Sequence, residues 1–386
     1  MVRIKKVADL EERLIEFTGR KHCLFVSRGA TALYLAYRAL KSIKKSDAGL
    51  GKGKIVLPAT LCHSPANVAF YAGLDPVFCD VSEDDYTLDP NHLEKILTIT
   101  NDVIAVVVVS CFGHVPAMQR ITDLCKEYNV YLIDDAAQSI GGICNGKPLS
   151  GWGDVGILSF GHSKIIDVGY GGAILTDDTS IYQYCKDLNE TLPLIDERVL
   201  KLRSIYSKTY YTVEKLASEN EELSALFWPF PQIFKELYIF RDTDLNRRID
   251  DIIDNIDNLP AILGERKRYW DIYRDRLKKH RSIKLPRMCD GMSPWRFTFR
   301  IQKTKRTSLV EGLRARNIDV STWYPSLQPR YPVSEPGNFI NCGVANTLSY
   351  ELVNLWIDPL NTNLSRVLYT CDIIDELLHP NYLINK

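Results

Sequence analysis

The stretch that decides the fold spans residues 130–176, VYLIDDAAQSIGGICNGKPLSGWGDVGILSFGHSKIIDVGYGGAILT. It contains two short apolar runs, of which the first ends in Asp134 and Asp135 and the second in Ser159 and Phe160. Apolar runs of this length, separated by glycine-rich turns, are typical of strands buried in a sheet. The stretch therefore predicts two core strands with polar side chains where each strand ends.

Asp135 is the first candidate for chemistry in this stretch. A carboxylate at the end of a buried strand must be paired, because an isolated buried charge is too costly to keep. One suitable partner is the protonated ring nitrogen of pyridoxal phosphate (PLP), where the acid makes the ring an electron sink. The alternative is a helix N-cap, since an Asp before Ala-Ala-Gln can cap a helix. Position alone leaves both interpretations open.

Lys164 carries the stronger signal, because it lies among Gly, His, Ser and Ile residues rather than in a charged surface segment. A partly desolvated lysine beside a cationic cofactor has a lowered pKa, so it can act as nucleophile and proton carrier. The alternative is a loop lysine with its amine in water. Lys164 follows Asp135 by 164 − 135 = 29 residues, with two strands' worth of apolar sequence between them, which favours the functional interpretation.

Together, Asp135, Ser159 and Lys164 match what PLP requires of a protein. The cofactor needs an anion opposite its ring nitrogen, donors around its phosphate, and an amine that holds its aldehyde as a Schiff base. A Gly-x-Gly-Gly cluster over residues 169–172 closes the stretch. Three loop histidines, His63, His114 and His162, are weaker candidates, because most such histidines are structural.

The bulk composition is that of a soluble globular protein. The 386 residues are 45% hydrophobic, and 48 basic residues balance 48 acidic ones. This length allows two domains with sizeable cores. A net charge of zero argues against a nucleic-acid partner, which would show clustered excess Lys and Arg. The longest apolar run, residues 103–109, is far shorter than the roughly 20 residues of a membrane span.

The ten cysteines are scattered, without a Cys-x-x-Cys pair. This spacing supports neither a metal site nor a disulfide framework, so we expect no metal and reduced thiols in a cytoplasm. The charged start, MVRIKKVADLEERL, cannot serve as the apolar core of a secretory signal.

Strand and helix patterns alternate through the first half of the chain. Strands are expected at residues 22–26, 55–58, 76–81, 103–110 and 130–134, and helices at 7–18, 30–40, 89–97 and 118–129. β-Branched runs that alternate with helices indicate a mainly parallel sheet covered on both faces. Ligands of such sheets bind beyond the carboxyl ends of the strands. Gly29 at the first strand-to-helix junction lets backbone N–H groups face an anion, although such turns often carry glycine for steric reasons alone.

The pattern changes after residue 176. Residues 181–242 indicate a helical elaboration, and residues 247–279 one long helix with a bend at Pro260. From residue 283 on, an alternating strand (296–302), a helix (308–317) and a strand (321–325) indicate a mixed unit. We therefore predict a large α/β domain over residues 1–250, and a bridging helix with a smaller α+β domain over residues 251–386.

With these residues in view, the sequence resembles the DegT/StrS group of sugar aminotransferases, which are PLP enzymes. The match extends over most of the chain, and its most specific segments are IDDAAQSIGG, GDVGILSFGHSK and GYGGAILTDD. Supporting segments are SRGATAL, LPATLCHSPANVAFYAGLDPVFCDV and NRRIDDI. The resemblance implies the aspartate-aminotransferase fold (PLP fold type I), PLP as cofactor, and a homodimer.

The resemblance also implies roles for single residues. Lys164 matches the lysine that binds the cofactor aldehyde and moves the proton during transamination. Asp135 matches the acid that holds the ring nitrogen, and Gln138 a residue that can hydrogen-bond the ring hydroxyl. Ser159 matches a phosphate ligand.

Further phosphate contacts follow from the same resemblance. The turn Gly29, Ala30 and Thr31 matches a set of phosphate donors. Asn246 matches a contact that the family takes from the neighbouring subunit, and Arg248 is a second candidate for it. Shared active sites are the reason to expect a dimer.

Two departures from the family pattern bear on the cofactor and the substrate. The family usually stacks an aromatic residue on the cofactor in the loop where this chain has Cys62 and His63. A thiol cannot stack as a ring does, so His63 or a residue elsewhere is expected to take this place. The helical stretch at 181–242 is longer than usual and is expected near the active-site entrance.

The implied function is transfer of an amino group from an amino-acid donor, expected to be glutamate, to a keto-sugar linked to a nucleotide. Some relatives carry histidine in place of the lysine and catalyse dehydration or deoxygenation, so Lys164 favours amino transfer. Two alternatives stay open: the same chemistry on a non-sugar ketone, and a PLP-binding protein without turnover.

Overall fold

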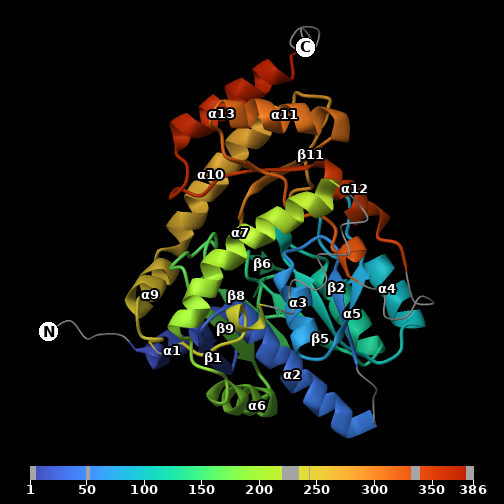
Figure 1. Ribbon diagram of the computed structural model, residues 1–386, viewed down its shortest axis with the longest axis vertical. Helices are drawn as coiled ribbons and strands as arrows, with labels where there is room; N and C mark the ends of the chain where they lie inside the picture. Colours follow the sequence, from blue (N-terminus) through green and yellow to red (C-terminus); the bar gives the residue numbers. More distant parts are fainter. Residues whose placement is uncertain (1–5, 49–52, 220–233, 243, 332–339, 380–386) are drawn as a thin grey trace, which may run out of the picture.

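The computed structural model describes residues 6–48, 53–219, 234–242, 244–331 and 340–379. Its larger part is built around a seven-stranded sheet in the lower half of Figure 1. The strands of this sheet are β1 (His22–Val26), β2 (Lys54–Pro58), β3 (Asp75–Cys79), β4 (Val103–Val109), β5 (Tyr131–Asp135), β8 (Val155–Ser159) and β9 (Gly172–Thr176).

The sheet is mainly parallel, as predicted. Its strand order is β1-β9-β8-β5-β4-β2-β3, and only β9 runs against its neighbours, pairing antiparallel with both β8 and β1. The interior strand β4 is buried at every position. A strand covered on both faces has no solvent side, which explains its unbroken apolar sequence VIAVVVV.

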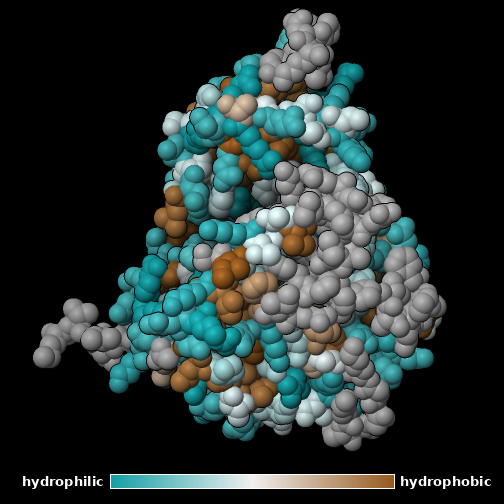
Figure 2. All heavy atoms as spheres, viewed as in Figure 1, coloured by the Kyte–Doolittle hydropathy of each residue, from teal (hydrophilic) through white to brown (hydrophobic). Residues whose placement is uncertain are grey.

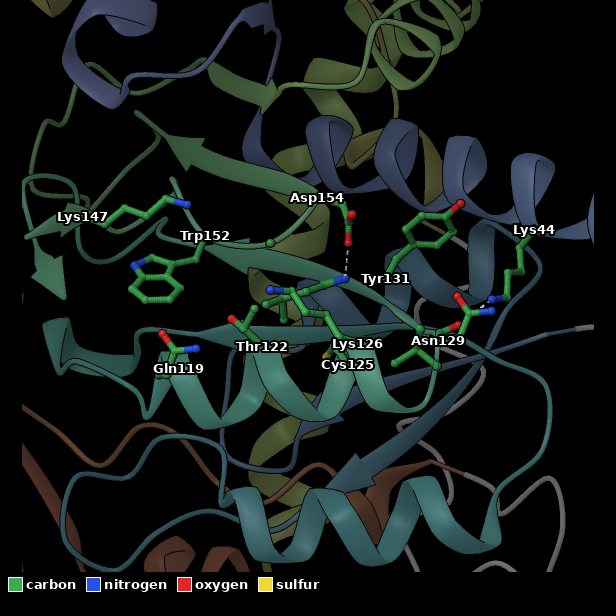
Figure 3. Close-up of a pocket in the computed structure, with 13 residues that line it drawn as sticks. Lys44, Gln119, Thr122, Cys125, Lys126, Asn129, Tyr131, Lys147, Trp152 and Asp154 are labelled. Atoms are coloured by element: carbon green, nitrogen blue, oxygen red, sulfur yellow. Dashed lines mark hydrogen bonds between the residues drawn. The ribbon is translucent and has the colours of Figure 1, made fainter. Parts of the chain in front are cut away.

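Helices cover both faces of this sheet. Figure 3 views it from the side, with α2 above the strands and α5 below them. Met118, Ile121, Leu124 and Cys125 form the buried side of α5, three or four residues apart as an amphipathic helix requires. The helices of this part are α1 (Val7–Thr18), α2 (Gly29–Ala48), α3 (Ser64–Tyr71), α4 (Pro90–Ile99), α5 (Met118–Glu127) and α6 (Thr179–Glu190).

The upper part of Figure 1 is a smaller unit with its own hydrophobic core. Its four-stranded antiparallel sheet has the order β10-β11-β13-β12. The elements are α10 (Leu259–Leu277), β10 (Ile283–Lys284), β11 (Phe297–Ile301), α11 (Lys303–Ala315), β12 (Val320–Ser321), α12 (Gly343–Glu351), β13 (Leu352–Leu355) and α13 (Leu364–Leu377). A smaller α+β unit is therefore confirmed, whereas the predicted boundary between residues 250 and 251 stays a prediction.

The long helix predicted over residues 247–279 is two helices. The first, α9 (Ile249–Asp257), ends at Asn258, and α10 begins at Leu259 with Pro260 in its first turn. Proline is well tolerated there because the first N–H groups of a helix have no partner within it. The expected bend is thus a helix end followed by a new helix start.

Two further expectations need correction. In the stretch 181–242, α6 and α7 (Glu197–Glu219) are helical, but residues 234–242 hold only the short 3-10 turn η3 (Lys235–Leu237), and residues 220–233 lie outside the described part. The strand predicted at residues 321–325 is shorter and comprises only β12, since Trp323 and Tyr324 turn toward a cavity.

A small hairpin of β6 (Ile143–Cys144) and β7 (Lys147–Pro148) was not expected. Within the described residues, no helix has the length and apolar character that a membrane crossing demands.

A buried ion pair ties the bridging helix α10 to the loop between β13 and α13. Nη2 of Arg266 lies 3.1 Å from Oδ1 of Asp358, and the two side chains are 2% and 5% exposed. Nη1 of Arg266 also donates to the carbonyl of Trp295 at 3.2 Å. Burial lowers the pKa of Arg266 and the Asp358 carboxylate raises it, so the pair keeps the guanidinium charged in the interior.

Replacing Asp358 by Ala should lower the free energy of unfolding by about 3–5 kcal/mol, because it leaves a buried guanidinium without its counter-charge. Urea denaturation would measure the loss. Asp372→Ala is the control, because Asp372 pairs with Arg276 at the surface and is 66% exposed; its loss should stay below about 1 kcal/mol. Equal losses in the two variants would contradict a stabilising role for the buried pair.

Candidate active site

The candidate active site is a cavity of about 360 Å³ at the carboxyl ends of β1, β2, β4, β5 and β8. Its volume lies in the range of small-molecule sites, roughly 300–1,000 Å³. Such a position is the expected one for a ligand of an open parallel sheet. Predicted site residues that line it are Gly29, Ala30, Cys62, Asp135, Gln138, Ser159 and Lys164.

Asp135 is the last residue of β5, Lys164 lies in the loop five residues after the neighbouring strand β8, and both line this cavity. Asp135 is 3% exposed, and its Oδ1 accepts the N–H of Ala137 at 2.9 Å. Burial raises the pKa of Asp135, whereas the Ala137 N–H and the Lys164 ammonium lower it. Residues 136–142 form turns and not a helix, so the N-cap interpretation of Asp135 does not hold. The acid and the lysine therefore share one cavity and interact electrostatically.

Asp134 precedes Asp135 on the same strand, so its side chain points to the other face of the sheet. Its Oδ2 accepts the backbone N–H groups of Ser150 at 2.6 Å and Trp152 at 3.2 Å. Asp134 therefore fixes the loop that leads into β8, and it is not among the residues that line the cavity.

One end of the cavity depends on close contact between α2 and the sheet. A Cβ atom on Gly29, the first residue of α2, would lie only 2.8 Å from Cβ of Ser159. A Cβ atom on Gly172 would lie 2.4 Å from the backbone N of Gly29. Glycine at these two positions lets the start of α2 approach the Ser159 hydroxyl. The first N–H groups of a helix have no partner within it, so this end of the cavity suits an anion.

A wall of aromatic side chains, Trp295, Trp323 and Tyr324, closes the cavity from the C-terminal part of the chain. The rings of Trp323 and Tyr324 stack with 5.7 Å between centroids. Gln138 holds this wall, because its Nε2 donates to the Tyr324 hydroxyl at 3.2 Å while its Oε1 accepts the N–H of Phe112 at 2.9 Å. Trp295 donates its indole N–H to the carbonyl of Ser163, beside Lys164. The sequence did not predict this wall, because no motif or spacing of its three aromatic residues relates them to β5 or β8.

Thr31 and His63 are predicted site residues whose side chains do not line this cavity. Thr31 is fully buried, and its Oγ1 donates to the carbonyl of Tyr238 at 2.9 Å. His63 has its Nε2 at 2.9 Å from the hydroxyls of both Tyr206 and Tyr238, and its ring packs on Tyr210 with 4.6 Å between centroids. These tyrosines hold His63 in a smaller neighbouring cavity, away from the ring-stacking place expected for it.

The other weak candidates differ in their surroundings. His114 is buried with its ring edge-on to Tyr86, 5.9 Å between centroids, and burial lowers its pKa to about 4, so it is part of the core. His162 lines the cavity but has a side chain that is 68% exposed.

Asn246 and Arg248 also lie outside the cavity of their own chain. Oδ1 of Asn246 accepts the N–H of Val7 at 3.2 Å. Nη1 of Arg248 donates to the carbonyl of Val168 at 3.0 Å, in the segment between Lys164 and β9. Their expected contact is with the phosphate of a neighbouring subunit, so it stays a prediction.

A larger hollow of about 780 Å³ lies at the opposite ends of the strands (Figure 3). Lys126 of α5 and Lys147 border it, together with Asp154, whose Oδ2 accepts the N–H of Leu132 at 2.8 Å. None of the residues predicted to bind the cofactor is among those that line it. Size alone therefore does not identify the active site.

Comparison with known proteins agrees with this geometry. The model of the DegT/DnrJ/EryC1/StrS aminotransferase family matches residues 2–200, just over half of the chain. The chain belongs to this family. Its aminotransferases are PLP-dependent, and all residues named above from Gly29 to Lys164 fall within the matched segment.

Individual relatives and structures support the assignment. GDP-perosamine synthase of Escherichia coli O157:H7 is 30% identical over 46% of this chain and 47% of that protein. The UDP-4-amino-4,6-dideoxy-N-acetyl-beta-L-altrosamine transaminase of Campylobacter jejuni serotype O:23/36 is 35% identical over 47% of this chain and 46% of that protein. The chain thus spans about half the length of these two relatives. S. venezuelae DesV shares the fold, with a TM-score of 0.74 and 20% identity over 97% of this chain and 90% of that one.

The buried Asp134 should make folding stability depend on pH. Burial raises its pKa to about 7 from the usual 3.8, so the folded state keeps a proton that the unfolded chain has lost. Stability from this group is therefore complete below pH 4 and decreases as the pH rises to about 7. Between pH 5 and pH 8 the loss should reach about 2–3 kcal/mol. Urea denaturation at both pH values should show a flatter profile for Asp134→Asn, which cannot ionise; parallel profiles would contradict this assignment.

Proposed function

We propose that this chain is a PLP-dependent aminotransferase whose active site is the cavity that holds Asp135 and Lys164. The observation that carries the proposal is the approach of these two side chains from β5 and β8, with the Lys164 ammonium lowering the pKa of Asp135. Membership of an aminotransferase family supports it. A lysine kept beside a buried acid also speaks against a PLP-binding protein without turnover.

The residues of the cavity fit PLP. The buried carboxylate of Asp135 suits the ring nitrogen. Burial raises the pKa of this carboxylate, which favours a proton shared between the acid and the ring. The start of α2 and the Ser159 hydroxyl, brought together by Gly29, suit the phosphate. When bound, PLP supplies an electron sink that allows an amino group and a carbonyl to be exchanged.

Within this arrangement each side chain has a separate task. Lys164 holds and moves a proton at its Nζ, and it is the amine within the cavity that can bind an aldehyde. Asp135 keeps a positive charge at the ring nitrogen, and the Ala137 N–H fixes the direction of its carboxylate. Trp295 holds the backbone beside Lys164 through the Ser163 carbonyl, which limits the movement of the lysine loop.

The acceptor is proposed to be a keto-sugar linked to a nucleotide. Both relatives described above are named for amino-sugar nucleotides, which supports this class. Aromatic faces such as those of Trp295 and Trp323 suit the apolar face of a sugar ring, and Arg28 adds a cation to the cavity. A second candidate, a non-sugar ketone, is favoured by the position of α7, whose Tyr206 and Tyr210 narrow the adjoining space.

Changing Lys164 to Ala should abolish amino transfer from glutamate, because the cavity loses its proton-carrying amine. Borohydride reduction of the wild-type protein with PLP should attach the cofactor mass to the peptide that contains Lys164, as read by mass spectrometry. If the Lys164→Ala variant still catalysed transamination, the proposal would be contradicted.

Neighbouring acids provide a matched pair of variants. Asp135→Asn should slow the reaction at least about a hundredfold, because a neutral amide no longer stabilises a protonated ring nitrogen. Asp134→Asn is equally buried but faces away from the cavity, so it should keep cofactor binding and activity within about threefold. Similar losses in both variants, measured as kcat/KM and as PLP affinity, would show that the effect is structural.

We further propose a homodimer in the cytoplasm that shares its active sites. Leu200 and Ile205 on α7 are 53% and 54% exposed, and apolar patches lie over α7 in the centre of Figure 2. Exposed apolar groups of this kind often mark protein contacts. Ten free cysteines suit a reducing compartment.

The dimer has two measurable consequences. Light scattering should give a mass of two chains, and Asn246→Ala should weaken PLP binding about tenfold by removing a phosphate contact from the partner subunit. Asn255→Ala is the control and should bind PLP normally, because the amide of Asn255 donates to the carbonyl of Asp251 within α9. A monomer, or unchanged affinity in Asn246→Ala, would rule out shared sites.

A further inference from the structure

Arg28 lies between the end of β1 and the start of α2, and it lines the cavity of Asp135 and Lys164. Its backbone forms an isolated β-bridge with Gly171, which lines the same cavity. Nη1 of its guanidinium donates to the carbonyl of Leu237 at 2.7 Å. The backbone and the tip of the side chain are thus both held, which limits the positions that the guanidinium can take.

The other polar side chains of this turn have no donor left for a ligand. The Ser27 hydroxyl donates to the carbonyl of Phe240 at 2.5 Å. The Thr31 hydroxyl donates to the carbonyl of Tyr238 at 2.9 Å. A hydroxyl has a single O–H, and the glycine and alanine that lie between Arg28 and Thr31 have no polar side-chain atom. Within this turn, Arg28 is therefore the residue whose side chain has N–H groups left to donate.

The charge of Arg28 is not balanced by an acid. Burial lowers its pKa, and the nearby Arg203 of α7 lowers it further. The groups that raise this pKa are the hydroxyls of Tyr206 and Tyr238 and the thiol of Cys62, and burial keeps both tyrosines neutral by raising their own pKa. In the part of the chain that the structure describes, no carboxylate forms an ion pair with this guanidinium. A half-buried cation without a counter-charge favours an anionic ligand.

We propose that the guanidinium of Arg28 binds a phosphate group in the cavity. A guanidinium presents parallel N–H groups that match two oxygens of a phosphate, and the contact with Leu237 occupies only one side of it. This inference rests on the proposed function, because the phosphate belongs to one of its two phosphate-bearing compounds, the cofactor or the nucleotide-linked sugar.

The position of Arg28 suits either source of the phosphate. Arg28 directly precedes Gly29, which lets the start of α2 approach the Ser159 hydroxyl, where the cofactor phosphate is proposed. Its guanidinium also lies near Cys62, at the border between the main cavity and the smaller one. The two sources differ in the affinity that is lost with Arg28, so two binding measurements distinguish them.

The first measurement compares the affinity of the cofactor-free protein for PLP with its affinity for pyridoxal, which lacks the phosphate. Both compounds carry the same ring and aldehyde, so the ratio of the two affinities isolates the phosphate. If Arg28 binds the cofactor, Arg28→Gln should lower this ratio roughly ten- to a hundredfold, as expected for the loss of charge-assisted hydrogen bonds. The absorbance of the bound ring gives both affinities.

The second measurement is calorimetric titration of the PLP-loaded protein with UDP and with GDP. If Arg28 binds the phosphate of the sugar substrate, Arg28→Gln should weaken the binding of the nucleotide that the wild-type protein prefers by roughly ten- to a hundredfold. The ratio of PLP to pyridoxal affinity should then stay within about twofold of the wild-type ratio. A loss in either measurement supports the inference and identifies the source of the phosphate.

Two further variants separate phosphate binding from folding. Arg38→Gln is the matched control, because Arg38 lies on α2 outside the cavity lining and its Nη1 donates to the hydroxyl of Tyr34 at 2.8 Å; it should change neither measurement. Arg28→Lys keeps the charge without the planar fork, so its loss should be smaller than that of Arg28→Gln. If melting curves show that Arg28→Gln is unfolded, Arg28→Lys decides the test.

The inference is overturned if the folded Arg28 variants keep both the wild-type ratio of PLP to pyridoxal affinity and the wild-type response to UDP and GDP. Failure of the proposed function gives a different result, because a wild-type protein that binds neither PLP nor pyridoxal contradicts the PLP-dependent activity itself. A wild-type protein that binds PLP and accepts an amino group, with Arg28 variants that bind phosphates normally, contradicts only the role of Arg28.

Discussion

The interaction on which the rest of the site depends is the one between a buried acid and a nearby ammonium at the ends of two adjacent strands. Burial raises the pKa of Asp135, whereas the Ala137 N–H and the ammonium of Lys164 lower it. The parallel pairing of β5 with β8 places the end of β5, which carries Asp135, beside the strand that leads into the Lys164 loop. Asp134, one residue earlier, faces the opposite side and supports the sheet instead.

The two parts of the chain meet around this pair. The α/β part provides the acid, the lysine and the glycine-lined anion end, while Trp295, Trp323 and Tyr324 close the cavity from the C-terminal part. Gln138 joins the two parts, because it contacts Phe112 on one side and Tyr324 on the other. Within the smaller unit, the buried pair Arg266–Asp358 joins α10 to the loop after β13.

The local sequence was sufficient to predict the bounds of elements whose hydrophobic pattern fits only one type of secondary structure. The helix α1 has the predicted bounds, and β1 and β4 match within one residue, because amphipathic and fully buried patterns leave little choice. It failed where long-range contacts decide. His63 is an example, because it is held by tyrosines more than a hundred residues away in the sequence.

The sequence by itself determined the mainly parallel sheet, the family, and the acid, hydroxyl and lysine of the candidate site. These features are predictable because strand ends and glycine turns are formed by residues that are neighbours in the sequence. Only the tertiary structure decided which polar groups face the cavity, that an aromatic wall closes it, and that His63 lines a smaller adjoining cavity together with Tyr206 and Tyr210 of α7. The physical reason is that burial and electrostatic pairing depend on distances between segments, and these distances are set by packing and not by the order of residues.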